Sequence, residues 1–122
     1  MYLVKFTDDA LENVKGLPKN VRNRLKKEIL EKVAKDPFGC SRELREPLKG
    51  FRSFSYEHYR VVFKVYEDLN AIGIAGIGKR DAQSQADVYK KLHALAAEGK
   101  LAEKVLATLQ GFSTPPPAEG PQ

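Results

Sequence analysis

Apolar and polar positions along the first third of the chain predict one strand followed by two helices. Residues 2–6 alternate as a short strand, and residues 7–9 (Thr-Asp-Asp) offer side-chain oxygens to the unpaired N–H groups of a following helix. Gly16 and Pro18 break this helix and start a second one, whose apolar stripe runs from Val21 to Val33. Asp36-Pro37 ends it, because proline cannot continue the helical hydrogen bonds.

The middle of the chain changes to strand periodicity after a loop that runs to Gly50. Residues 51–56 alternate, Glu57-His58 forms a turn, and residues 59–66 resume as an aromatic and β-branched run, so these segments predict a hairpin. Residues 71–77 are apolar on both faces, as expected for a covered central strand, and their glycines predict a close approach by another backbone.

The last third predicts two helices and a tail. A helical pattern begins at Asp81, breaks at Gly99 and resumes over residues 101–109, where the apolar stripe packs on the sheet or on the preceding helix. Residues 113–122 are Pro-rich and predict a flexible tail. The order β-α-α-β-β-β-α-α predicts one α+β domain over residues 1–112. It has a small, mainly antiparallel sheet, an N-terminal helical hairpin packed on one face, and C-terminal helices.

Composition and charge indicate the cellular compartment and the kinds of partner to expect. A chain of 122 residues suits a single domain, and the lone Cys40 excludes an internal disulfide, which fits a reducing cytoplasm. No segment reaches the length of a membrane span, so we expect a soluble protein without a membrane partner. The net charge of +5 favours anionic partners such as nucleic acid, the ribosome surface or an acidic protein segment.

The candidate chemistry is metal-free. The sequence contains no phosphate-binding glycine loop, no metal-ligand cluster and no Ser-His-Asp pattern, so we expect neither a metal nor another cofactor. Metal-free RNA cleavage uses the ribose 2′-hydroxyl as nucleophile and needs groups that transfer protons and neutralise the phosphate. Arg60 and Arg80 are the leading candidates, because a guanidinium stays charged and donates two hydrogen bonds to one phosphate.

Several motifs, in their order along residues 2–92, resemble the RelE/ParE superfamily of bacterial toxins. They are Leu48-Lys49-Gly50, Tyr59-Arg60-Val61-Val62-Phe63, Gly78-Lys79-Arg80 and Asp87-Val88-Tyr89. The resemblance implies a toxin held inactive by a cognate antitoxin, to which the C-terminal helix is a possible point of displacement. The RelE-like branch cuts mRNA in the ribosomal A site, and the ParE-like branch acts on DNA gyrase.

The resemblance also implies roles for individual residues. Arg60 and Arg80 match the RelE-like arginines that bind the scissile phosphate. Tyr89 matches a tyrosine assigned to base stacking or proton transfer, and Lys79 is an auxiliary phosphate contact. His58 and His93 are candidate acids or bases, since histidine titrates near neutrality, or else ordinary surface histidines.

The first hairpin strand departs from the RelE pattern, which places two basic residues on the active face. Counting back from Tyr59-Arg60 puts Ser53 and Ser55 there. A shorter turn would offer Arg52, although alternation assigns its neighbour Phe54 to the apolar side. On either count a basic group is missing from the substrate-binding set.

Three functions therefore stay open. The favoured one is a ribosome-dependent mRNA endoribonuclease. The alternatives are a ParE-like toxin that binds gyrase without nuclease activity, and an inactive relative that only binds its partner. A cognate antitoxin is the expected protein partner in each case, with ribosome and mRNA added in the first. The sequence does not define an oligomeric state.

Overall fold

The N-terminal elements form as their sequence predicts. The computed structural model describes residues 1–79 and 82–111, with side chains for 1–79 and 89–111, so Arg80 and the predicted tail lie outside the described residues. β1 (Leu3–Phe6) leads into α1 (Asp8–Lys15), and α2 (Lys19–Glu28) continues into a π-helical turn, η1 (Ile29–Val33). The Thr7 side chain caps α1 by accepting a hydrogen bond from the Ala10 N–H at 3.1 Å.

The remaining elements complete a five-stranded sheet of order β1-β5-β4-β3-β2. They are β2 (Arg42–Glu43), β3 (Arg52–Tyr56), β4 (Tyr59–Tyr66), the 3-10 turn η2 (Glu67–Leu69), β5 (Ala71–Lys79), α3 (Ala82–Ala97) and α4 (Lys100–Leu109). β1 and β5 are parallel, and the other neighbours are antiparallel. The predicted α+β fold is confirmed. β2 was not predicted: it has two residues and lies within the predicted loop.

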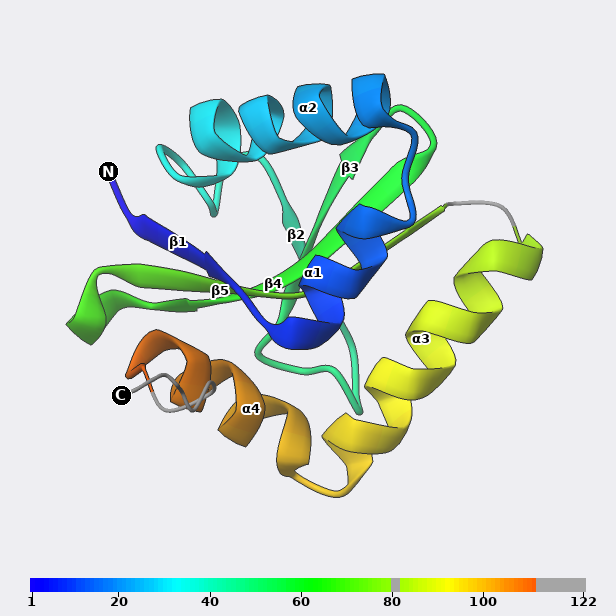
Figure 1. The fold of residues 1–122 in the computed structure, drawn as a ribbon. Helices are drawn as coiled ribbons and strands as arrows, with labels where there is room; N and C mark the ends of the chain where they lie inside the picture. The colour runs from blue at the N-terminus through cyan, green and yellow to red at the C-terminus, as the bar shows by residue number, and fades with distance from the viewer. Residues whose placement is uncertain (80–81, 112–122) are drawn as a thin grey trace, which may run out of the picture.

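Helices cover both faces of the sheet (Figure 1). On the α1–α2 face, Phe54, Val61 and Phe63 pack against α1, α2 and η1. On the α3–α4 face, Val62 and Ala75 pack with side chains of α3 and α4 and with the loop before β3. β4 and β5 are therefore buried on both sides. None of the described helices is long and apolar enough to cross a membrane.

A β-bulge in β5 explains which of its side chains face each of the two cores. Val62 pairs with Gly76 and Phe63 pairs with Ile74, so Ala75 is an extra residue in the ladder. The bulge shifts the alternation by one position. As a result Ile72, Ile74 and Ile77 all face α1 and α2, although their spacing is not uniformly even.

Side chains of α3 and α4 lie close to Gly73 and Gly76 of β5. The sequence predicted the approach of another backbone at these glycines, but the neighbouring atoms belong mainly to side chains. A Cβ atom built on Gly73 would overlap the Val105 side chain of α4, and one on Gly76 would lie 3.1 Å from Leu92 Cδ1 of α3. These two glycines therefore fix how closely α3 and α4 dock on the sheet.

Candidate functional site

Arg60 lies on the α3–α4 face of the sheet, near the hairpin end of β4. It pairs with Ser55 of β3 on one side and with Gly78 of β5 on the other. Its side chain is half-buried, and its Nε is buried without a hydrogen-bond partner. No salt bridge among the described residues involves Arg60. Arg60 thus carries a charge and a donor that the described part of the protein leaves unused.

Arg60 lines a polar hollow of about 410 Å³. The hollow is lined by Gly39, Cys40, Ser41, Arg42, Ser53, Ser55 and Arg60. Ser53 is only 4% exposed, and its hydroxyl also lacks a hydrogen-bond partner. Buried polar groups in folded proteins are nearly always satisfied, so two side chains with an unsatisfied buried atom in the lining of one hollow make it a candidate site for an acceptor-rich ligand.

The register of the β3–β4 hairpin shows whether Ser53 and Ser55 or Arg52 share the face of Arg60. Ser55 lies opposite Arg60, so Ser53 and Ser55 share the Arg60 face, while Phe54 is in the opposite core. Arg52 is not part of the hollow's lining.

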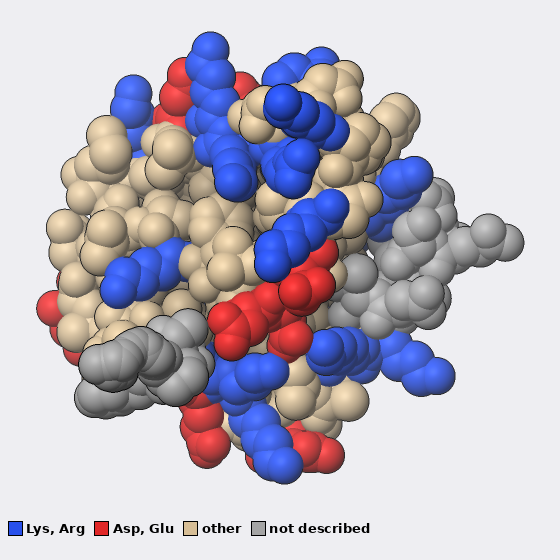
Figure 2. Space-filling model, in the orientation of Figure 1, with Lys and Arg blue, Asp and Glu red and all other residues tan. Residues whose placement is uncertain are grey.

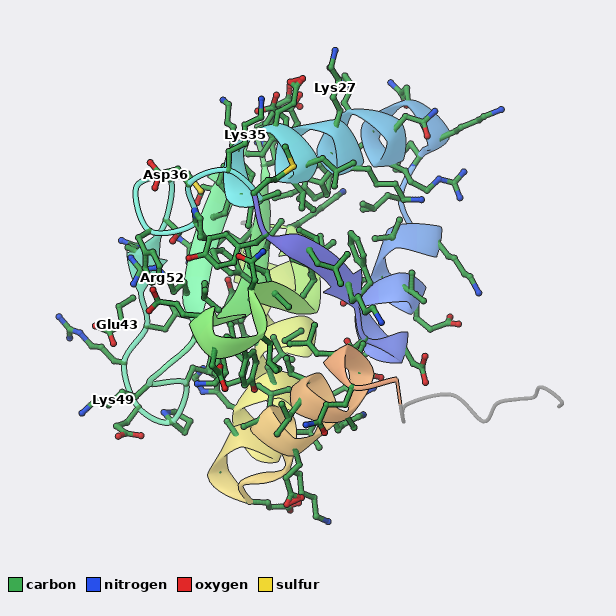
Figure 3. The ribbon with its side chains drawn as sticks, turned by 90° about the vertical axis from the view of Figure 1, so that its left-hand side faces the viewer. Lys27, Lys35, Asp36, Glu43, Lys49 and Arg52 are labelled. Atoms are coloured by element: carbon green, nitrogen blue, oxygen red, sulfur yellow. The ribbon has the colours of Figure 1, made fainter. Side chains whose placement is uncertain are left out.

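The Arg52 side chain instead forms hydrogen bonds with the loop that makes up one wall of the hollow. Its Nε donates to Ser41 Oγ at 2.7 Å, and its Nη2 donates to the Ser41 carbonyl oxygen at 3.2 Å. Its guanidinium also lies over the Phe38 ring, 5.2 Å from the centroid. Asp36, Glu43 and Arg52 all lie on this loop side of the fold (Figure 3). A substrate-binding role for Arg52 stays a prediction that these contacts do not favour.

Arg42 is a basic residue of the hollow that sequence reasoning missed. Pairing of β2 with β3 sets Arg42 directly opposite Ser53. Arg42 is exposed and lines the hollow of Arg60 as well as a second, neighbouring one. The only sequence signal was an arginine in a loop, because a strand of two residues has no periodicity to detect.

Tyr89 and His93 lie together in the second hollow, which has a volume of about 500 Å³. Their rings are edge-to-face, with centroids 6.4 Å apart, as expected for residues four apart on α3. The Tyr89 hydroxyl is buried and has no hydrogen-bond partner. The other lining residues are Arg42, Glu43, Leu44, Arg45, Glu46 and Leu48. Arg42 therefore joins the hollow of Arg60 to the hollow of Tyr89.

The other predicted site residues lie apart from these hollows. His58 is exposed in the turn between β3 and β4. Lys79 pairs with Tyr59 and follows Gly78, so alternation places it on the face opposite Arg60. Arg80 lies outside the described residues, and its role stays a prediction.

Two further properties bear on chemistry in the hollow of Arg60. Burial, and secondarily the Asp36 carboxylate, raise the pKa of the Cys40 thiol, so this wall of the hollow is a neutral thiol near neutral pH. Within residues 1–79 and 89–111, no three side chains of the His, Cys, Asp and Glu types converge as metal ligands.

An ion-pair cluster links α1, α3 and α4. Asp9 of α1 accepts hydrogen bonds from Lys91 at 2.9 Å and from Lys104 at 2.7 Å. Acidic atoms gather over α1 with basic atoms beside them (Figure 2). Burial alone would raise the pKa of Asp9, but the hydrogen bonds and charges of Lys104 and Lys91 outweigh it and lower the pKa.

We expect Asp9→Asn to destabilise the protein by about 1 kcal/mol at pH 7, since both lysines are largely exposed. A lowered pKa in the folded state means that the carboxylate stabilises the fold at pH values above its unfolded-state pKa. This contribution is lost as the pH falls through the folded-state pKa. Urea unfolding at pH 7 and pH 3 measures it: the difference between wild type and Asp9→Asn should shrink at pH 3. An equal difference at both pH values would contradict the ion-pair origin.

Comparison with known proteins agrees with the fold. This fold is that of the RelE/ParE superfamily of toxins. Residues 4–84 match the family described as ParE toxin of type II toxin-antitoxin system, parDE, and the chain belongs to this family. The matched region includes Arg42, Ser53 and Arg60 but ends before Tyr89 and His93.

Solved structures with the same fold include toxins alone and toxins bound to antitoxins. The RelBE2 toxin-antitoxin complex from Mycobacterium tuberculosis matches with a TM-score of 0.62 and 22% identity, over 65% of this chain and 98% of that one. The intact E. coli RelBE complex matches with a TM-score of 0.56 and 25% identity, over 66% and 99%. The isolated E. coli RelE toxin matches with a TM-score of 0.57 and 20% identity, over 81% and 98%. No curated protein matches the sequence.

Proposed function

We propose that this toxin inhibits translation as a ribosome-dependent mRNA endoribonuclease that needs no metal for the cleavage step. The observation that carries the proposal is the Arg60 guanidinium, which is unpaired among the described residues and shares a polar hollow with Arg42. Two arginines at one hollow suit a phosphodiester, because each donates charge-assisted hydrogen bonds to phosphate oxygens. The similarity to RelE structures supports the same choice.

The arrangement assigns a role to each part of the site. The ribose 2′-hydroxyl attacks the scissile phosphate while Arg60 and Arg42 bind its non-bridging oxygens and stabilise the added negative charge. Ser53 and Ser55 donate hydrogen bonds to the same group. Tyr89 and His93, in the adjoining hollow, stack on a neighbouring base or transfer a proton. Arg80 directly follows β5 in the sequence and stays a predicted further phosphate ligand.

The products of the reaction test this proposal. Purified toxin is incubated with translating ribosomes, and the 5′ ends of the mRNA fragments are mapped. Attack by the 2′-hydroxyl leaves a 2′,3′-cyclic phosphate on one fragment and a 5′-hydroxyl on the other. Fragments with these ends, produced only when ribosomes are present, are expected. Intact mRNA under ongoing translation would contradict the proposal.

A second candidate is a ParE-like toxin that inhibits DNA gyrase without cutting RNA. It is favoured by the family match, which is to ParE toxins, and by serines at the two hairpin positions beside Arg60. A gyrase supercoiling assay distinguishes the two, because only this alternative predicts inhibition of the purified enzyme. An inactive relative would do neither and would only bind its partner.

We also propose a cognate antitoxin as the main protein partner. Two of the similar structures are toxin-antitoxin complexes. Purification from native cells is expected to yield a small co-encoded protein bound to the toxin. Recovery of the toxin alone under gentle conditions would count against this partner.

Replacing Arg42 with alanine is expected to lower the cleavage rate about tenfold, the cost of one charge-assisted hydrogen bond to phosphate. Single-turnover cleavage on ribosomes measures it. Lys49→Ala is the matched control, because Lys49 is an exposed cation of the same loop that lines neither hollow. A loss of the same size in both variants would show that Arg42 acts only through net charge.

A further inference from the structure

The positive charge of the chain is concentrated on one helix. Residues 19–35, which span α2, η1 and the two residues after them, contain seven Lys or Arg residues and two Glu residues, a net charge of +5. The whole chain also has a net charge of +5. The rest of the protein is therefore neutral overall, and the excess charge belongs to this segment.

Many of these cations are exposed, and few of them have a salt-bridge partner among the residues that the structure describes. Lys19, Lys26, Lys27 and Lys35 are exposed, and the salt bridges of this segment use Arg24 and Lys32 instead. Lys27 projects from α2 away from the sheet (Figure 3), and basic atoms gather over α2 in Figure 2. We call the four exposed lysines the α2 ridge.

The α2 ridge is separate from the hollow of Arg60, but α2 lies close to the hairpin end of β3 and β4, where Arg60 is located. α2 packs on the opposite face of the sheet from Arg60. Arg24 of α2 forms a 3.6 Å salt bridge with Glu57, in the turn that joins Ser55 and Arg60 through β3 and β4. A polyanion bound along α2 therefore reaches the hairpin tip beside the hollow.

We propose that the α2 ridge docks on the phosphate backbone of ribosomal RNA. A row of exposed lysines without salt-bridge partners among the described residues suits phosphate groups, from which binding releases counterions without any sequence preference. A protein partner would need an apolar centre. The segment exposes one large apolar side chain, Leu30, at 55%. This inference rests on the proposed function, because it supplies the contact that makes cleavage depend on the ribosome.

Co-sedimentation of full-length toxin with purified 70S ribosomes, over a series of KCl concentrations, tests the docking surface. The ridge variant replaces Lys19, Lys26 and Lys27 with glutamine, which has a helix propensity similar to that of lysine. We expect affinity at low salt to fall about tenfold or more, and the salt dependence to fall by about one phosphate contact for each lysine. The matched control replaces three exposed lysines elsewhere, Lys15, Lys49 and Lys100, with the same change in net charge.

The outcomes separate this inference from the proposed function. Equal affinity of the ridge and control variants, whether reduced or not, would overturn the docking surface, as would a ridge variant that loses only antitoxin binding. Wild-type protein that binds ribosomes through the ridge but leaves mRNA intact would overturn the nuclease and retain the docking surface. Wild-type protein that binds no ribosomes would overturn both.

Discussion

Arg60→Ala is expected to reduce cleavage of ribosome-bound mRNA by about 100-fold or more and to abolish growth inhibition on induction. Removal of one preorganised donor to a developing charge costs about that much in other enzymes. The cleavage rate of Arg60→Lys should lie between those of the wild type and Arg60→Ala, since lysine keeps the charge but lacks the planar guanidinium. The measurement is single-turnover cleavage by purified protein, with growth and translation followed in parallel.

The stability of the same variant distinguishes a functional from a structural arginine. Because Arg60 Nε is buried without a hydrogen-bond partner, truncation removes an unsatisfied group, and the midpoint of thermal unfolding should stay the same or rise. Lys64→Ala is the control. Lys64 is the next cation on the same face of β4, over the rings of Phe51 and Tyr66. Full toxicity of Arg60→Ala, or an equal loss in Lys64→Ala, would remove Arg60 from the mechanism.

The elements that depend on local chemistry could be predicted from the sequence. Thr7 caps α1, Asp36-Pro37 follows the second helix, and the hairpin strands begin and end near their predicted residues, because caps, proline and alternation act over a few residues. Alternation also placed Ser53 and Ser55 on the Arg60 face correctly.

Features that depend on distant pairing could not be predicted. β2 exists only because Arg42 and Glu43 find partners about ten residues away, and this pairing brings Arg42 to the hollow. The bulge at Ala75 has no local signature, because every residue of β5 from Ala71 to Gly78 is small or apolar. The contribution of Arg80 stays a prediction from the resemblance.

The docking of α4 depends on Gly73, and a single added methyl group should disturb it. A Cβ atom on Gly73 would overlap Val105, which is fully buried. Gly73→Ala would otherwise stabilise the protein by about 0.4–1 kcal/mol through the unfolded chain. We expect overpacking to dominate and to destabilise it by about 1–3 kcal/mol. Urea unfolding of purified protein measures the difference.

A double-mutant cycle identifies the cause of this loss. Val105→Ala alone leaves a cavity and costs about 1–3 kcal/mol, but in the Gly73→Ala background it makes room for the new methyl group. The two changes should therefore be coupled by about 0.5–3 kcal/mol in the favourable direction. Gly16→Ala is the control, because its Cβ would lie no closer than 3.6 Å to any neighbour. Simple additivity of the two mutations would show that contact between β5 and α4 does not set the position of the helix.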